Sequence, residues 1–155
     1  MQHYADSSFL LQLLSPDFAT AASIAVHRRL GRPVYAFCPL HELEVPNALR
    51  LRLFAASGLA APARITRRRE VATGMKRLNH FLTIGCPRRT PIDWDAVIAR
   101  AQSLSERFSE KLGSRSLDIL HVGMALTLHA DAFLTCDRNQ AALAKAAGLN
   151  VSLVA

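Results

Sequence analysis

The chain has 155 residues, of which half are hydrophobic and about a fifth are charged. This composition fits one globular domain over 1–155 and excludes disordered and collagen-like proteins. Lys and Arg outnumber Asp and Glu by 19 to 12, which gives a net charge of +7. No apolar run approaches the roughly 20 residues of a membrane-spanning helix, so no membrane partner is expected.

Short strand patterns alternate with helical patterns along the chain. The expected elements, in chain order, are a strand at 3–5, helices at 7–14 and 16–30, a strand at 34–38, helices at 40–57, 62–85, 94–108 and 117–129, a strand at 132–135, a helix at 138–147 and a strand at 151–154. Strands separated by helices form parallel sheets that are covered on both faces. The expected fold class is therefore α/β with a central parallel sheet.

Apolar residues at helical spacing indicate which side of each helix faces the core. The expected core residues are Leu43, Leu49, Leu53 and Phe54, then Val71, Met75, Leu78 and Leu82, and then Trp94, Val97, Ile98, Ala101, Leu104 and Phe108. Asp93 is expected to cap the helix that begins at Trp94. The helix at 117–129 is apolar nearly all round, so we expect it to be buried.

The cysteines and the N-terminal sequence indicate in which cellular compartment the protein is expected. Cys38, Cys86 and Cys136 are odd in number and about fifty residues apart, which fits neither a disulfide framework nor a zinc site. We expect reduced, mostly buried thiols. The N-terminal residues show no basic segment followed by an apolar secretory core, so we expect a cytoplasmic protein.

Basic residues are concentrated in the middle of the chain. Residues 50–115 hold 14 basic and five acidic side chains, a net of +9, whereas the remaining residues have a net of −2. Polyanions are natural partners of such a segment. The basic side chains form either the solvated face of a helix or a track for RNA phosphates; they are Arg64, Arg67, Arg68, Arg69, Lys76, Arg77, Arg88 and Arg89.

Acidic residues follow the predicted strands. Asp6 comes directly after the first strand and Asp137 after the third, Glu42 and Glu44 open the helix after the second strand, and Asp118 opens the buried helix. Ligands of open parallel sheets bind beyond the carboxyl ends of the strands. We therefore expect four or five of these acids to converge on one edge of the sheet.

Each acid also has an ordinary structural explanation. Asp6 and Asp137 precede helices and are suitable caps, and Asp118 lies in a first turn, where the helix dipole favours a negative charge. Capping does not explain convergence, because neighbouring carboxylates repel and must take up protons or bind a cation. Mg²⁺ and Mn²⁺ prefer such an all-oxygen site. A cluster of this kind supports phosphodiester hydrolysis by metal-activated water, without a Ser, His or Cys nucleophile.

Four blocks contain these acids: YADSS at 4–8, LEVPNALR at 43–50, RSLDILHV at 115–122 and FLTCDRNQ at 133–140. In this order the blocks resemble the PIN-domain family of metal-dependent ribonucleases, in particular VapC-like toxins of toxin–antitoxin pairs. The resemblance implies a three-layer αβα Rossmann-like domain. It also implies that Mg²⁺ or Mn²⁺ is bound by four catalytic acids, namely Asp6, Glu44, Asp118 and Asp137. Thr135 and Asn139 would then orient water or a ligating carboxylate.

Pro46 departs from the family pattern, because a proline inside a helix cannot donate a backbone hydrogen bond. It makes the start of this helix uncertain and leaves Glu42 as an alternative to Glu44, although the alignment through 47–49 favours Glu44.

His41 and His121 lie close in sequence to the acids. Each is interpreted as a satisfied structural group in preference to a direct ligand.

The expected function is that of a Mg²⁺- or Mn²⁺-dependent endoribonuclease, the toxin of a toxin–antitoxin pair. Its expected partners are an RNA substrate, a cognate antitoxin protein and a second copy of the chain in a homodimer. The alternative is a catalytically weak PIN-like module that binds RNA or protein. A phosphohydrolase on a flavodoxin-like sheet is disfavoured, since Ser8 stands where a second Asp is required.

Overall fold

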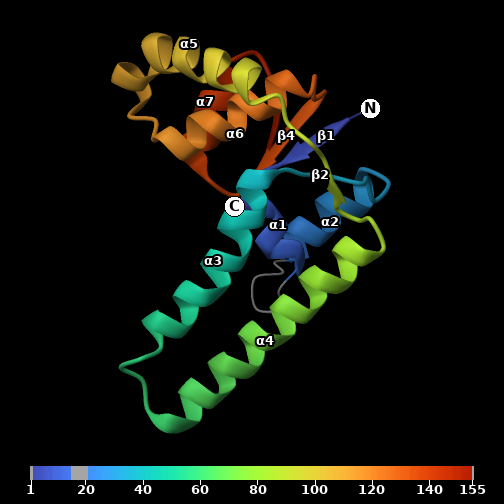
Figure 1. The fold of residues 1–155 in the computed structure, drawn as a ribbon, viewed down its shortest axis with the longest axis vertical. Helices are drawn as coiled ribbons and strands as arrows, with labels where there is room; N and C mark the ends of the chain where they lie inside the picture. The colour runs from blue at the N-terminus through green and yellow to red at the C-terminus, as the bar shows by residue number, and fades with distance from the viewer. Residues whose placement is uncertain (1, 15–20, 155) are drawn as a thin grey trace.

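The computed structural model describes residues 2–14 and 21–154 as a mixed α/β protein (Figure 1). Its elements in chain order are β1 (His3–Ala5), α1 (Ser7–Leu14), α2 (Ala21–Arg29), β2 (Ala36–Phe37), α3 (Pro39–Ala55), α4 (Ala61–Thr83), β3 (Arg88–Arg89), α5 (Trp94–Leu112), α6 (Ser116–Thr127), β4 (Ala132–Thr135), α7 (Arg138–Ala146) and β5 (Asn150–Leu153). The predicted alternation of strands and helices is confirmed. The first part of the helix predicted at 16–30, residues 16–20, lies outside the described residues.

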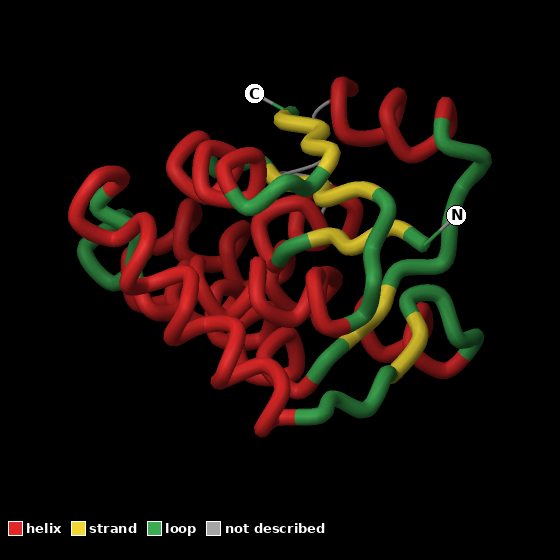
Figure 2. Tube along the Cα trace, turned by 90° about the horizontal axis from the view of Figure 1, so that it is seen from above, coloured by secondary structure: helices red, strands yellow, loops and turns green. Residues whose placement is uncertain are grey.

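The described strands form two small parallel sheets (Figure 2, strands in yellow). One sheet has the order β1-β4-β5, with Tyr4 opposite Phe133 and Phe133 opposite Val151. The other pairs β2 with β3, a strand that the sequence analysis missed. The parallel pairing is as predicted, but β2 belongs to its own sheet. Because β1 and β4 are adjacent and parallel, their carboxyl ends lie side by side.

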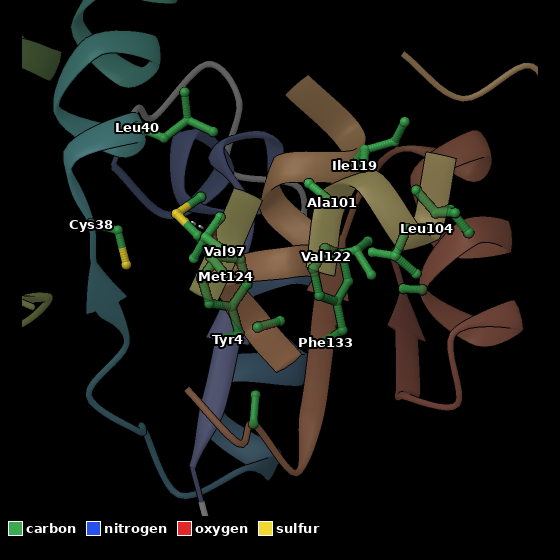
Figure 3. Packing of buried hydrophobic residues seen from close by; sticks show 14 of the residues in the cluster. Tyr4, Cys38, Leu40, Val97, Ala101, Leu104, Ile119, Val122, Met124 and Phe133 are labelled. Atoms are coloured by element: carbon green, nitrogen blue, oxygen red, sulfur yellow. Dashed lines mark hydrogen bonds between the residues drawn. The ribbon is translucent and has the colours of Figure 1, made fainter. Parts of the chain in front are cut away.

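Apolar side chains fill both faces of the β1-β4-β5 sheet, as predicted. Tyr4 and Phe133 point into a core shared with α5, α6 and α7, whose labelled residues include Val97 and Val122 (Figure 3). Side chains alternate along a strand, so the next residues, Ala5 and Leu134, belong to a second core. That core is built mainly from α1, α3 and α4.

The predicted core face of α5 is correct at its centre and wrong at its margin. Asp93 caps the helix, since its Oδ1 accepts a hydrogen bond from the backbone N of Ala96 at 3.1 Å. Val97 is buried, as are Ala101 and Leu104. Trp94 and Ile98, however, are 40% and 44% exposed. At about 100° per residue, Ile98 lies a quarter turn from Val97, so it falls outside the contact with α6.

The predicted core face of α3 is largely wrong. Leu49 is fully buried, whereas Leu43 and Phe54 are 65% and 77% exposed, and Leu53 is also exposed. Leu43 and Phe54 are eleven residues apart and share one side of the helix, while Leu49 lies about 120° away from Leu43. A single helix cannot bury both sides against one neighbour. Leu49 faces the second core, and Leu43 and Phe54 face away from it.

Helices α3 and α4 form a long hairpin that projects from the rest of the molecule (Figure 1). Val71 and Leu78 of α4 are buried, as predicted. A close approach at Gly74 joins the two helices, because a Cβ atom there would lie 3.1 Å from Leu49 Cδ2. The hairpin is therefore held by apolar contacts near the body.

Two other expectations concern the thiols and the membrane. Cys38 is buried, Cys86 and Cys136 are half-buried, and all three are free thiols, as predicted. Within 2–14 and 21–154, no helix is both long enough and apolar enough to cross a bilayer.

Candidate active site

Asp6 lies at the carboxyl end of β1 and is only 1% exposed. Its backbone N donates to the carbonyl of Leu134 in β4 at 3.0 Å. Its Oδ1 accepts hydrogen bonds from Ser8 Oγ at 2.7 Å and from the backbone N of Phe9 at 2.8 Å, and its Oδ2 accepts one from Thr135 Oγ1 at 2.5 Å. Burial raises the pKa of the Asp6 carboxyl, although these donors oppose the shift.

Asp137 follows β4 and caps α7. Its Oδ1 accepts hydrogen bonds from the backbone N atoms of Asn139 at 2.7 Å and Gln140 at 3.0 Å. Its own backbone N donates to Thr135 Oγ1 at 2.9 Å. The Thr135 hydroxyl therefore connects Asp137 to Asp6, as expected for a residue that orients a carboxylate. Asn139 also contacts Asp137, by donating its backbone N–H to Oδ1.

Glu44 lies on α3 and is half-buried. Its Oε2 accepts hydrogen bonds from Ser7 Oγ at 2.6 Å and from His121 Nε2 at 2.5 Å. Burial by itself would raise the pKa of Glu44, but the hydrogen bond and charge of His121 and the Ser7 hydroxyl lower it below the usual value. Since Ser7 follows Asp6 directly, Glu44 lies beside the end of β1.

Glu42 points to a different place. Its Oε1 accepts a hydrogen bond from Arg89 Nε at 2.8 Å on the surface. Two positions in a helix are separated by about 200° around the axis, so Glu42 and Glu44 face opposite sides. The helix is continuous from Pro39 through Pro46, contrary to the doubt that this proline raised about the start of the helix.

Asp118 lies in the first turn of α6 and is half-buried. Its Oδ2 accepts a hydrogen bond from the backbone N of Arg115 at 3.3 Å. Burial raises the pKa of Asp118, and the negative charge of Asp137 raises it further. His121 follows one turn later on the same helix, so Asp118 and Glu44 are both associated with α6.

The two histidines have different roles in the structure. His41 uses both ring nitrogens for the backbone: Nδ1 accepts from Cys38 N at 3.0 Å and Nε2 donates to the carbonyl of Ala5 at 3.0 Å. Burial, with His121 beside it, holds the pKa of His41 well below the usual value. His41 is thus the satisfied structural group that the sequence favoured. His121 instead contacts the side chains of Glu44 and Tyr4.

Contacts from four chain segments therefore bring the acids to the same edge of the sheet. Thr135 connects Asp6 with Asp137, Ser7 and His121 hold Glu44, and Asp118 lies one turn from His121. In the described parts of the chain, no three His, Cys, Asp or Glu side chains are grouped so that they could hold a metal ion. Each carboxylate has its own protein donors; that of Asp118 is the backbone N of Arg115, and within the described residues no hydrogen bond joins Asp118 to another of the acids.

Three of the acids keep one oxygen outside these contacts. No hydrogen bond from another described residue reaches Oε1 of Glu44, Oδ1 of Asp118 or Oδ2 of Asp137. Such oxygens retain their full capacity to accept a donor or a cation. Asp6 differs, since both of its oxygens accept hydrogen bonds.

Sequence reasoning missed Ser7, Ser8 and Tyr4 as parts of the site. The serines directly follow Asp6 at the start of α1, and that position was the only available signal. Ser8 Oγ also accepts a hydrogen bond from Cys136 N at 2.9 Å, which is a second connection between the ends of β1 and β4. No sequence pattern indicates the contact of Tyr4 with His121, because these residues are 117 positions apart.

Comparison with models of known protein families and with curated protein sequences gave no match.

Proposed function

We propose that the chain is a metal-dependent endoribonuclease with a three-layer αβα Rossmann-like PIN domain, acting as the toxin of a toxin–antitoxin pair. One observation carries the proposal. Hydrogen bonds hold Asp6, Asp137 and Glu44 at the carboxyl ends of the adjacent parallel strands β1 and β4, and Asp118 lies one turn before His121, which holds Glu44. This edge is where open parallel sheets bind their ligands.

The donor set fits a hard divalent cation. Carboxylate oxygens are the preferred ligands of Mg²⁺ and Mn²⁺, and Glu44, Asp118 and Asp137 each keep one oxygen without a hydrogen bond from a described residue. The raised pKa values of Asp6 and Asp118 indicate that a nearby positive charge would stabilise their ionised forms. When bound, the cation supplies an activated water and neutralises negative charge on the phosphate.

The residues of this chain hold the acids in place. Thr135 and Ser8 fix Asp6, and Ser7 and His121 fix Glu44. Ser7 and Ser8 donate their protons to carboxylates, so neither hydroxyl is prepared to attack a phosphate. The Cys38 thiol is buried, which raises its pKa to about 12. Hydrolysis by water is therefore the chemistry that this edge supports.

The basic middle of the chain supports RNA as the substrate. Helix α4 alone contains six Arg and Lys residues and one Glu, and most of these basic side chains are exposed. Exposed guanidinium and ammonium groups attract phosphates without selecting a sequence. Helix α4 runs from the tip of the hairpin to the body (Figure 1), so an RNA strand held along it would extend towards the body of the protein.

The exposed side of α3 supports a protein partner. Leu43, Leu51 and Phe54 are exposed and follow one another along the helix, a pattern that suits an amphipathic helix of an antitoxin. An Arg or Lys of that partner would form charge-assisted hydrogen bonds with the acids and compete with the metal. We further propose a homodimer and a cytoplasmic location, on the resemblance to VapC-like toxins.

A catalytically weak PIN-like module that binds RNA or protein is the second candidate. It is favoured by the absence, in 2–14 and 21–154, of three side chains grouped to hold a metal. The buried position of Asp6, with both oxygens in hydrogen bonds, favours it as well. Cleavage assays separate this candidate from the nuclease.

The decisive experiment is cleavage of labelled RNA by the purified chain with Mg²⁺ or Mn²⁺ and with a chelator. We expect cleavage only with the metal, and its loss in Asp118→Asn, Asp137→Asn and Glu44→Gln, because each change removes a charged ligand. Glu42→Gln is the matched control and should retain most of the activity, since Glu42 pairs with Arg89 on the surface. Cleavage in chelator, or in all three variants, would exclude the proposed mechanism. Metal-dependent RNA binding without cleavage would favour the weak module.

A further inference from the structure

His121 is a buried side chain at the centre of the contacts that hold the acids. Its Nε2 donates to Glu44 Oε2 at 2.5 Å, and its Nδ1 lies 2.7 Å from the hydroxyl oxygen of Tyr4. Ser7 Oγ, which also donates to Glu44 Oε2, lies 3.5 Å from the same Nε2. The imidazole therefore joins a residue of β1 to an acid of α3.

The chemistry of its partners gives these hydrogen bonds a direction. A carboxylate only accepts, so His121 Nε2 carries the proton that is donated to Glu44. In the neutral ring Nδ1 is then the acceptor, and the Tyr4 hydroxyl is the donor. Tyr4 is fully buried within the first core, so its hydroxyl has a fixed position. Tyr4 thereby favours the tautomer and the ring orientation that Glu44 requires.

His41 offers a contrast within the same site. The two imidazole rings have centroids 5.1 Å apart, and both side chains are buried. His41 bonds only to backbone atoms, those of Cys38 and Ala5, and so joins two chain segments. Within the described chain, the ring nitrogens of His121 contact only side chains, and one of them holds the carboxylate of Glu44. Burial alone therefore does not account for the contacts of His121.

We propose that His121, supported by Tyr4, is a positioning residue that holds one oxygen of Glu44 and leaves the other available to a divalent cation. This role rests on the proposed function. Both hydrogen bonds to Glu44 reach Oε2, so the carboxylate is oriented while Oε1 stays available. Without His121, only Ser7 would hold the acid, and the side chain would regain rotamer freedom that cation binding must remove.

Mn²⁺ binding, measured by calorimetry on the full chain, tests this proposal without requiring RNA cleavage. We expect His121→Ala to weaken Mn²⁺ binding by about 10-fold to 100-fold, the range for lost contacts that orient a metal ligand. Glu44→Gln should weaken it at least as much. In the double variant, His121→Ala should add less than about twofold to the effect of Glu44→Gln, because a positioning residue has no effect without the acid that it positions.

Two further variants keep the test valid if His121→Ala fails to fold. His121→Gln should restore most of the affinity, because its amide can donate to Glu44 and accept from Tyr4. Tyr4→Phe should weaken binding less than His121→Ala does, since it removes only the support. His80→Ala is the matched control, because His80 is exposed on α4, and it should not change the affinity. Thermal unfolding of every variant confirms the folded state.

The outcomes distinguish this role from the proposed function. If Glu44→Gln weakens Mn²⁺ binding but neither His121→Ala nor Tyr4→Phe does, the positioning role is wrong and the metal site stands. Additive effects in the double variant would likewise overturn it. If the wild-type chain binds no Mn²⁺ and cleaves no RNA, the proposed function fails and the role of His121 fails with it.

Discussion

The Asp6 side chain caps a helix and also lies among the acids of the candidate site. Its Oδ1 accepts from the backbone N of Phe9 and so caps α1, while its Oδ2 faces the Thr135 hydroxyl at the end of β4. A cap at the surface stabilises a helix with little cost. At Asp6 the carboxylate is buried, and burial raises its pKa. Capping therefore explains the choice of Asp but not its removal from water.

The pH dependence of stability tests this view of Asp6. Because the pKa of Asp6 is raised in the folded chain, its contribution to the free energy of unfolding is greatest below its unfolded pKa and falls as the pH rises through its folded pKa. Asn does not ionise, so Asp6→Asn removes this loss of stability at neutral pH. We expect the variant to have the higher Tm at pH 7, by a few degrees, since 1 kcal/mol corresponds to about 2–4 °C at this size. The difference should narrow as the pH falls towards the usual carboxyl range.

Thermal unfolding at several pH values measures this difference, and Mg²⁺ provides the control. A cation that binds the folded chain should raise the Tm of the wild type and have a smaller effect on Asp6→Asn, because the lost charge weakens the attraction of a cation to the neighbouring acids. A wild type that is more stable at neutral pH, with no narrowing in acid, would mean that the hydrogen bonds of Asp6 outweigh its burial.

For single residues, the sequence predicted which acids follow a strand, but it did not predict which side chains contact them. Asp6 and Asp137 were placed correctly because each directly follows a strand, and parallel strands bring their ends together. The partners of Glu44 could not be predicted, since Ser7 and His121 reach it only after α3 and α6 have packed. Contacts between distant side chains depend on tertiary packing, which a local pattern does not contain.

At the scale of elements, helix geometry limits what the basic residues of α4 can contact together. Arg67, Arg68 and Arg69 are consecutive and therefore point about 100° apart. Arg67 also pairs with Glu70 at 2.9 Å. Arg64 and Arg68 are four residues apart and share one side, where they line a hollow of about 240 Å³ at the junction with α3. We therefore expect this pair, in preference to the consecutive three, to contact one strand of RNA.

Removing this pair of charges tests the RNA track. We expect Arg64→Ala with Arg68→Ala to weaken binding of single-stranded RNA for every sequence. Two lost phosphate contacts should also reduce the slope of log K against log salt by about 1.4. Fluorescence titrations at several salt concentrations measure the slope.

The matched control is Arg100→Ala with Lys111→Ala, which removes two exposed charges from α5. This control should leave the slope nearly unchanged, because it alters the net charge equally but lies at the opposite end of the molecule from the tip of the hairpin (Figure 1). Equal effects of the two pairs would show that only the overall charge of the chain matters.

Element prediction succeeded where periodicity is strong and failed where it is weak. The ends of α7 follow from the Asp137 cap and from Gly148, which has a positive φ, and Asp93 marks the start of α5. Helix α5 ends at Leu112, before Gly113, and so continues four residues beyond the predicted end. Strand β3 consists of two exposed arginines, which have no alternation to detect. The exposed leucines of α3 were misassigned because apolar spacing alone cannot show which side of a helix has a neighbour.

At the scale of the whole molecule, the site and the hairpin are connected by α3. Near its start this helix carries Glu44, held by Ser7 and His121, and further along it carries the exposed Leu51 and Phe54. Exposed apolar groups in a row are costly in water and typical of protein-binding surfaces. A partner that covers the length of α3 would therefore reach from the hairpin to the acids.

Growth of cells that express the chain tests the proposed toxin and partner together. A nuclease with a general metal mechanism is harmful unless it is restrained. We therefore expect the wild type, expressed alone, to slow growth, and Asp6→Asn to permit it. Co-expression of a small neighbouring gene that encodes the proposed antitoxin should restore growth, because we expect such a partner to cover α3 and direct a basic side chain to the acids. Phe54→Ala should remain toxic but should lose this rescue, since Phe54 belongs to the covered surface and lies away from the acids. Normal growth of cells that express the wild type well and alone would contradict the toxin assignment, while leaving a nuclease of narrow substrate range.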